Sequence, residues 1–295
     1  MSQAIVMAAT IDRERTRIEN ASIRSATAAV RDLRAGLIQH VEGHIPLGPI
    51  LHTFQSSMAK SIHSGMVTAH LQGRLRSAIT AERFMRGRNG KALKLSTIDD
   101  AMEFLTRRLN LSPQAAAQIQ AQYGQAATTA AGTLGDGVLK IAEQVAVDTV
   151  AGGLTTSGAV SAIRQALDSR GLTISNPYQI STIYRTSVQT AYSAGRWSAN
   201  EDPAIQEILW GYEYSAVMDD RTTELCSSLD GMRRAAGDPV WDRLTPPNHY
   251  NCRSTVIEVF NHGVLATPTE VPDVSAAAGF GFNPGKVFAD LLRAA

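Results

Sequence analysis

This chain of 295 residues has few cysteines, few aromatic residues and almost no net charge. Its two cysteines, Cys226 and Cys252, are too few for a disulfide framework, so any role that they have belongs to one local site. The 28 lysines and arginines nearly balance the 27 aspartates and glutamates. Because no positive field surrounds the whole chain, it is not expected to coat DNA, and nucleic-acid binding would require a local basic patch.

The sequence also lacks a long apolar run. No stretch approaches the roughly 20 uninterrupted apolar residues that a membrane-spanning helix requires. The first residues lead into a charged segment at residues 12–17, without the apolar core of a secretory signal. We therefore expect synthesis in the cytoplasm and no stable membrane span.

Helical spacing dominates the first half of the sequence. Apolar residues separated mostly by three, four or seven positions predict an amphipathic helix over residues 1–42. Two prolines and two glycines within residues 43–49 cannot continue it and predict a turn. A second helix is expected over residues 51–84.

Serine or threonine caps predict the starts of two further helices. Ser96 or Thr97 opens one after a basic, glycine-containing loop at residues 85–95, and Ser112, followed by proline, opens the other. The glycine-rich residues 132–137 lack the ending of a phosphate-binding loop, so we interpret them as a helix cap or linker. The apolar spacing beyond them predicts a new helix that stops at residues 152–153.

The sequence changes character after residue 153. Helices are expected over residues 154–170 and 178–199, and β-branched and aromatic residues predict strands at residues 208–214 and 254–259. The prolines beyond them predict an extended tail with one short terminal helix. The predicted fold class is α+β, with a mostly helical N-terminal portion followed by a small mixed module with a few antiparallel strands. The expected regions are a helical docking region (1–153), an α+β module (154–260) and an extended C-terminal tail (261–295).

Two thiols and one imidazole form a candidate metal site. Cys226, His249 and Cys252 lie near a Pro-Pro turn and a glycine, and they would fill three of the four positions around zinc. Asp220, Asp230 or water would supply the fourth ligand. Two other arrangements remain open, namely two free thiols that pack as small hydrophobic groups and a disulfide between the cysteines.

Two ordered strings carry the most specific information in the sequence. The first reads R-T-S-V-Q-T-A-Y-S-A-G-R from Arg185, and the second reads D-D-R-T-T-E-L-C-S-S-L-D-G from Asp219 and is closed by P-P-N-H-Y-N-C-R. Together with F-N-P-G at residues 282–285, they resemble the head-morphogenesis, or minor head protein, family of tailed bacteriophages, which includes the Mu F-like proteins. The candidate motif residues are Arg185, Thr186, Asp219, Asp220, Arg221, Thr222, Gly231, Pro246, Pro247, Asn251 and Arg253.

The resemblance covers about a third of the chain, residues 181–285, and implies a structural and assembly role rather than an enzyme. It implies action in capsid assembly or at the portal or head interior, with the portal, major capsid or scaffold protein as partner. The implied location is the head of the virion, after synthesis in the host cytoplasm. The first 150 residues lie outside the resemblance and show only generic helical patterns.

The charged motif residues have a structural interpretation. Asp219 or Asp220 can pair with Arg221 and Arg253, since arginine suits two-pronged carboxylate binding, and the segment at Arg185 can join the same network. An anion or phosphate site is the alternative.

Two further functions remain as alternatives. One is a metal-dependent hydrolase or nuclease built on the Cys226, His249 and Cys252 cluster, with Asp220 or Glu224 as the base. The zinc deaminase signature and a dense set of carboxylates are both absent, which weighs against it. The other is a DNA-associated protein ejected with the genome, through a basic cluster of Arg83, Arg86, Arg88, Lys91 and Lys94.

The remaining histidines are not expected to bind metal. His40 and His44 have suitable spacing, but a glycine ends their helix and no acid stands where a zinc protease needs it, so we interpret them as a solvated helix end. His52, His63 and His70 are scattered along a polar helix and are assigned no role.

Overall fold

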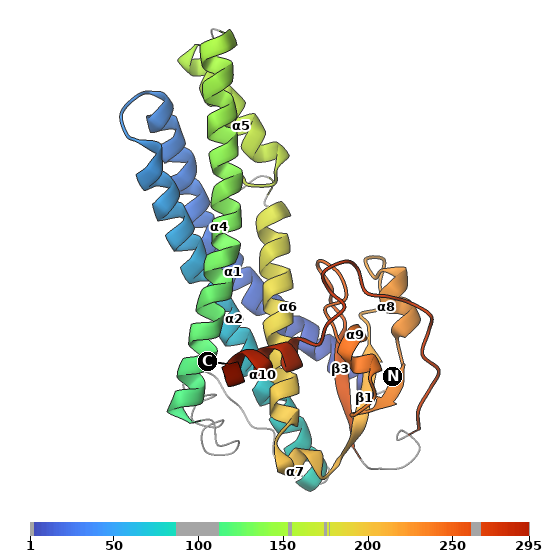
Figure 1. The fold of residues 1–295 in the computed structure, drawn as a ribbon. Helices are drawn as coiled ribbons and strands as arrows, with labels where there is room; N and C mark the ends of the chain where they lie inside the picture. Colours follow the sequence, from blue (N-terminus) through green and yellow to red (C-terminus); the bar gives the residue numbers. More distant parts are fainter. Residues whose placement is uncertain are drawn as a thin grey trace. The chain divides into compact units, whose positions relative to one another are not determined.

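The computed structural model describes residues 3–86, 112–152, 155–173, 176, 178–260 and 267–294. Figure 1 shows long helices followed by short helices and strands, and none of the described helices is long and apolar enough to cross a membrane. The predicted α+β class, with a small antiparallel sheet after the helical portion, is confirmed. The elements are α1 (Gln3–Val41), α2 (Leu47–Arg86), α4 (Pro113–Gly152), α5 (Thr156–Ser169), α6 (Tyr178–Asn200), α7 (Pro203–Gln206), β1 (Leu209–Ser215), α8 (Glu224–Leu229), β2 (Arg233–Ala235), α9 (Val240–Leu244), β3 (Thr255–Phe260) and α10 (Pro284–Ala294).

The turn between α1 and α2 is shorter than the sequence predicts. Two residues after the end of α1 stands a left-handed residue, Gly43, whose N–H donates to the His40 carbonyl over 2.9 Å. Helix α2 already begins at Leu47, so Pro49 lies in its first turn. Proline is tolerated there because the first helical N–H groups have no intrahelical partner.

Helix α4 corrects the prediction for residues 132–137. These residues were expected to form a cap or linker, but α4 continues through them without a break. Leu134 and Val138, which flank the glycines, are fully buried. Burial of these side chains outweighs the roughly 1 kcal/mol that each helical glycine costs. The predicted start is confirmed, since the N–H of Ala115 donates to the Ser112 hydroxyl over 3.1 Å.

The chain divides into two compact units, each built from separated segments. Helices α1, α2, α4 and α6 contribute residues to both, and the predicted division at residues 153 and 260 stays a prediction. Unit 1 consists of Met1–Ile18, Met66–Ile119 and Arg185–Ala295, and unit 2 consists of Glu19–Gly65 and Gln120–Tyr184.

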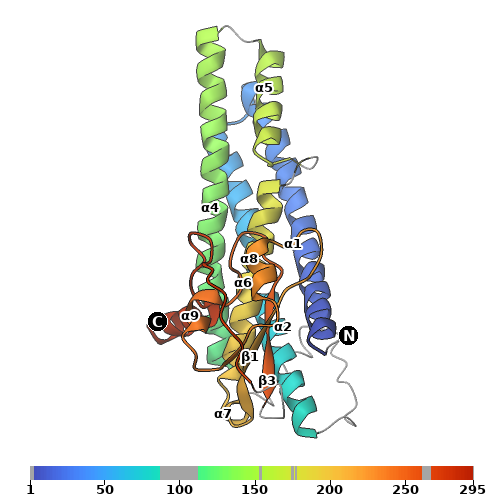
Figure 2. The same cartoon turned by 90° about the vertical axis from the view of Figure 1, so that its right-hand side faces the viewer.

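Unit 2 is a helical assembly. Segments of α1, α2 and α4 run side by side in both views (Figures 1 and 2), with small and aliphatic side chains between them. The Ser61 hydroxyl donates to the Ser22 carbonyl over 3.0 Å in the buried interior. Apolar packing of helix faces therefore provides most of its stability, as the predicted amphipathic pattern requires.

Unit 1 contains the sheet and the short helices α8, α9 and α10. The strand order is β2-β1-β3, both pairs are antiparallel, and Tyr212 on β1 lies opposite Glu258 on β3. The two predicted strands are confirmed as β1 and β3. Strand β2 was not predicted, because its three residues, Arg-Arg-Ala, carry no apolar alternation. Tyr212 contacts Trp197 and Trp241, with ring centroids 5.0 and 5.6 Å away.

A buried carboxylate joins β3 to two helices of unit 1. Glu258 accepts hydrogen bonds from Ser77 on α2 at 2.5 Å, and from Arg196 at 2.5 Å and Asn200 at 3.1 Å on α6. The side chains of Glu258 and Arg196 are each only 1% exposed. Because a buried charge is tolerated only when it is paired and hydrogen-bonded, these contacts hold the strand against the helices.

Helices α2 and α6 approach each other closely through two glycines. A Cβ atom at Gly195 would lie 2.0 Å from the His70 carbonyl oxygen, and one at Gly73 would lie 2.2 Å from the Tyr192 carbonyl oxygen. His70, to which the sequence assigned no role, is fully buried, and burial holds its pKa well below the usual value. It is a neutral packing residue, with its ring centroid 4.8 Å from that of Phe288 on α10.

The short terminal helix predicted for the tail is α10. The Asn283 side chain accepts the N–H of Gly285 over 2.9 Å and donates to the Trp241 carbonyl over 3.1 Å. Gly285 leaves no room for a side chain, because a Cβ atom there would lie 2.3 Å from Cβ of Trp197. The F-N-P-G string therefore caps α10 and seats it on α6.

We expect Glu258→Gln to destabilise the protein by about 3–5 kcal/mol, because it leaves the Arg196 charge buried without its counter-ion. Urea unfolding followed by circular dichroism measures the change. Asp242→Asn is the control, since its ion pair with Lys286 is about half exposed and is worth only about 0–1 kcal/mol. Equal losses in the two variants would contradict the role of the buried pair.

We expect Gly195→Ala to destabilise the protein by about 1–3 kcal/mol, because the added methyl group meets the backbone of α2. Gly132→Ala is the matched control within a helix, since nothing lies within 4 Å of its added Cβ atom. That control should be neutral or stabilised by up to about 1 kcal/mol through helix propensity. Thermal melting of both variants tests the pair, and an unchanged Gly195→Ala protein would refute the close approach.

Candidate metal centre

The three predicted metal ligands come from one helix and one loop of unit 1. Cys226 lies in the first turn of α8, whose N-cap Thr223 accepts the Cys226 N–H over 3.3 Å. His249 and Cys252 lie between a cis Pro246-Pro247 bond and the start of β3. Both cysteines are buried and His249 is partly buried. The Thr223 cap thus orients one thiol, and the turn after the prolines presents the other two groups.

The structure brings these three side chains together. Sγ of Cys226 lies 3.1 Å from Nε2 of His249 and 3.8 Å from Sγ of Cys252. All three potential ligand atoms lie within 4.8 Å of one another. The sulfurs are not bonded, and both cysteines are free thiols. The predicted proximity of the three groups is confirmed, whereas their role as ligands stays a prediction.

Neighbouring polar groups orient the cluster. Nδ1 of His249 lies 2.8 Å from the Tyr250 carbonyl oxygen, which can only accept, so Nδ1 carries the proton. The hydroxyl of Tyr214 lies 3.3 Å from Sγ of Cys226 and accepts a hydrogen bond from Asn248 over 3.1 Å. The tyrosine proton is therefore available to the sulfur.

The contacts of the cluster shift its pKa values in a consistent pattern. The hydrogen bond with Cys252, followed by that with His249, lowers the pKa of the Cys226 thiol. The hydrogen bond with Cys226, together with burial, raises the pKa of the Cys252 thiol well above its usual value. The contact with Cys226 also raises the pKa of His249. The pattern favours a thiolate at Cys226, which is the form that binds metals.

The backbone behind the cluster is anchored to two helices. Arg15, on α1, is buried and donates to the Arg253 carbonyl over 2.6 Å. Gln189, on α6, donates to the Ser254 carbonyl over 2.7 Å. The segment that carries Cys252 is therefore held from both sides, at the point where β3 begins.

Asp219 makes the carboxylate–guanidinium pair that the sequence predicts. Both carboxylate oxygens face Arg253, with one Nη1–Oδ2 distance of 2.8 Å, and Arg221 lies 3.7 Å from the same carboxylate. The hydrogen bond from Arg253 holds the pKa of Asp219 well below its usual value. Asp220 is exposed, and Asp230 accepts the N–H of Ala216 over 2.8 Å. Neither belongs to the metal-ligand cluster among the described residues.

The other motif residues shape the surrounding turns. Thr186 on α6 accepts the N–H of Asn251 over 3.4 Å, and Asn251 has a left-handed backbone with φ of 57°. Gly231 ends α8 with φ of 78°, a conformation that favours glycine. Thr222 hydrogen-bonds to the Val217 carbonyl. Pro246 and Pro247 are buried, and Arg185 is exposed.

Several residues of the module were not singled out from the sequence. Glu258 lies on β3, and its burial depends on partners that are distant in sequence. Asn248 and Tyr214 support the cluster through side-chain hydrogen bonds. Arg196 is the last residue of the first string, and this position was the one feature of the sequence that pointed to it.

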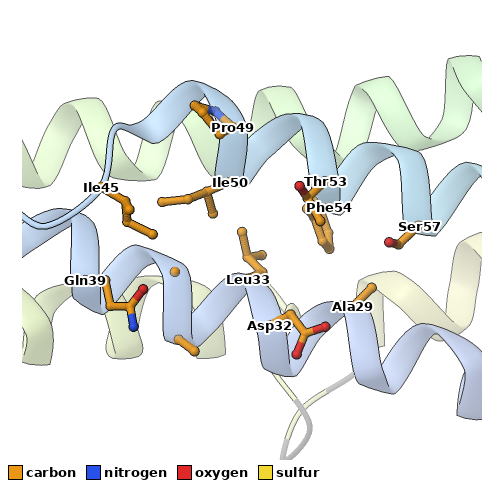
Figure 3. A pocket seen from close by; sticks show the side chains of 12 residues that line it. Ala29, Asp32, Leu33, Gln39, Ile45, Pro49, Ile50, Thr53, Phe54 and Ser57 are labelled. Atoms are coloured by element: carbon orange, nitrogen blue, oxygen red, sulfur yellow. The ribbon is translucent and has the colours of Figure 1, made fainter.

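A second candidate site is an apolar pocket in unit 2, about 340 Å³ in volume, between α1 and α2. Figure 3 shows Leu33 and Ile50 pointing into the space between the two helices. Asp32 is the one ionisable residue in its lining. The lining therefore provides neither a second carboxyl group for acid–base catalysis nor a set of metal ligands.

The interpretation of His40 and His44 as a helix end fits the structure. Nδ1 of His40 lies 2.9 Å from the Ile45 carbonyl oxygen, and His44 is exposed beside Glu42. Neither belongs to a potential metal cluster among the described residues.

Residues 140–257 match the sequence profile of the family described as "Phage Mu protein F like protein". Over these residues, about 40% of the chain, the sequence is similar to the Mu F-like family. It is 33% identical over 91 residues to "Mu-like prophage FluMu F protein" of Haemophilus influenzae, which is 31% of this chain and 22% of that protein. It is 34% identical over 89 residues to "Putative capsid assembly protein F" of Escherichia phage Mu, which is 30% of this chain and 20% of that protein.

The resemblance predicted from the two strings is thus confirmed. The Mu F-like region includes all three residues of the cluster and ends one residue before Glu258. The matched part of the chain spans less than a quarter of the length of each of these relatives. No solved structure matches this chain.

We expect Asp219→Asn to be less stable than the parent protein at neutral pH, with a difference that shrinks on acidification. The folded-state pKa of Asp219 is depressed, so its stabilisation is present above the unfolded pKa of about 3.9 and is lost as pH falls below it. Urea midpoints of both proteins, measured from neutral pH to below pH 4, test this. Asp220→Asn is the exposed control, and a constant difference at all pH values would contradict the prediction.

Proposed function

We propose that this chain is a structural and assembly component of a tailed-phage head, acting in capsid assembly or at the portal or head interior. The observation that carries the proposal is the 34% sequence identity over 89 residues to a protein named for capsid assembly. The match of residues 140–257 to the Mu F-like family supports it. The portal, major capsid or scaffold protein would be its partner, and the virion head its location.

The contacts of the Mu F-like region support a structural role. Its charged and polar motif residues are used to hold backbone segments together, as in the pairs Asp219–Arg253 and Asn251–Thr186. Asn248, buried within the region, donates to both the Tyr214 hydroxyl and the Leu244 carbonyl. Such contacts fix loops in one conformation and do not require a substrate.

The hydrolase alternative is weaker. A catalytic metal needs a general base beside the reacting water, and the group around Cys226 includes no carboxylate among the described residues. Asp220 and Glu224, the bases suggested by the sequence, are both exposed. We therefore propose that the chain has no hydrolase activity.

The DNA-associated alternative depends on the basic cluster after α2. Arg83 is exposed near the end of α2, whereas residues 88–94 lie outside the described residues, as does the helix expected from Ser96. The near-neutral balance of 28 basic and 27 acidic residues favours a protein partner over DNA for the chain as a whole. Packaged DNA remains a secondary partner in this proposal.

The proposal predicts that heads of the phage or prophage that encodes this chain contain it at few copies relative to the major capsid protein. Quantitative mass spectrometry of purified heads measures the ratio. Deletion of the gene should give defective heads, and the chain supplied in trans should restore them. The Asp242→Asn variant should restore heads as well as the parent chain does, and the destabilised Glu258→Gln variant should restore them poorly.

Normal, infectious heads that form without this chain would overturn the assembly role. Hydrolysis of nucleic acid by the pure protein, lost in Cys226→Ala, would overturn the non-enzymatic part of the proposal.

A further inference from the structure

We propose that Cys226, His249 and Cys252 bind a single Zn²⁺ ion that ties α8 to the loop preceding β3. The proposal is independent of the head-assembly role, because it rests on the chemistry and geometry of three side chains. Zinc favours sulfur and nitrogen ligands of this kind, in tetrahedral arrangement.

The spacing of the sulfurs fits a shared metal better than a disulfide. Two thiolates that are each about 2.3 Å from a tetrahedral zinc lie about 3.8 Å from each other. The observed Sγ–Sγ distance between Cys226 and Cys252 is 3.8 Å. A disulfide would need about 2.05 Å. The Nε2 atom of His249 also lies beside this pair, 3.1 Å from Sγ of Cys226.

The surroundings of the three groups match those of protein zinc ligands. A zinc-bound histidine commonly donates its second ring N–H to a backbone carbonyl, and Nδ1 of His249 faces the Tyr250 carbonyl oxygen at 2.8 Å. This contact leaves Nε2 as the ligand atom, directed toward the sulfurs. Backbone hydrogen bonds from Asn248 and Ser254 reach Cys252, and the Tyr214 hydroxyl reaches Cys226. Such donors stabilise thiolates and tune the bound metal.

The fourth zinc position would be filled by water. No fourth His, Cys, Asp or Glu joins the cluster within the part of the chain that the structure describes. His249 is partly exposed and Thr223, whose hydroxyl lies 3.0 Å from Nε2, is exposed, so solvent reaches this side of the site. The ion would cross-link α8 and the loop preceding β3, and binding would therefore stabilise the folded state.

The test uses the full chain, stripped of metal by a chelator under reducing conditions and then titrated with Zn²⁺. We expect about one zinc per chain, measured by mass spectrometry of the metal content, and a melting temperature that rises with zinc concentration. His249→Gln and Cys252→Ser should lose the high-affinity zinc. His63→Gln is the matched control, because His63 contacts the Gln120 carbonyl in unit 2, and it should bind zinc as the parent does.

Two further measurements keep the test valid if a ligand variant fails to fold. Co²⁺ bound to the parent protein should show a thiolate-to-metal charge-transfer band. Tyr214→Phe keeps all three ligands and should weaken zinc affinity by roughly 10- to 100-fold. Zinc affinity that is equal in the parent and His249→Gln proteins, a cobalt spectrum without thiolate bands, or a Cys226–Cys252 disulfide in protein isolated with thiols trapped would each overturn the proposal.

Discussion

The buried carboxylate of Glu258 is the constraint on which unit 1 depends. It lies on an edge strand and is compensated by Arg196 and Asn200 from α6 and by Ser77 from α2. Because an uncompensated charge in this position would cost several kcal/mol, the strand and both helices are stable only together. The glycines at the α2–α6 crossing allow the close approach that this arrangement needs. The Arg196–Glu258 ion pair therefore fixes how strand β3 packs against the helices.

The cluster of Cys226, His249 and Cys252 is built outward from that frame. Strand β3 begins just after Cys252, and the carbonyl groups of Arg253 and Ser254 are held by Arg15 and Gln189. Hydrogen bonds to these backbone carbonyls thereby fix the position of Cys252. The Thr223 cap fixes the position of Cys226. The three side chains are held in place because they follow directly from hydrogen-bonded backbone elements.

These features together suit a component of a large assembly. The buried Arg196–Glu258 pair and the hydrogen-bonded loops would give the proposed head component a constant surface for its partners. A zinc ion at the cluster would add to this rigidity without any need for turnover.

The sequence by itself determined the α+β class, the long helices, the strands β1 and β3, and the gathering of the cysteines with His249. Helical spacing, strand alternation and the ordered strings are local properties, so they can be recognised without a structure. It misplaced the start of α2, because proline is tolerated in the first turn of a helix. It also misplaced a break at residues 132–137, because burial of Leu134 and Val138 overrode the local glycine signal. Only the tertiary structure decided the partners of Glu258, the choice of Asp219 over Asp220, and the burial of His70. Those outcomes depend on contacts between segments far apart in the chain, whose energies no local pattern records.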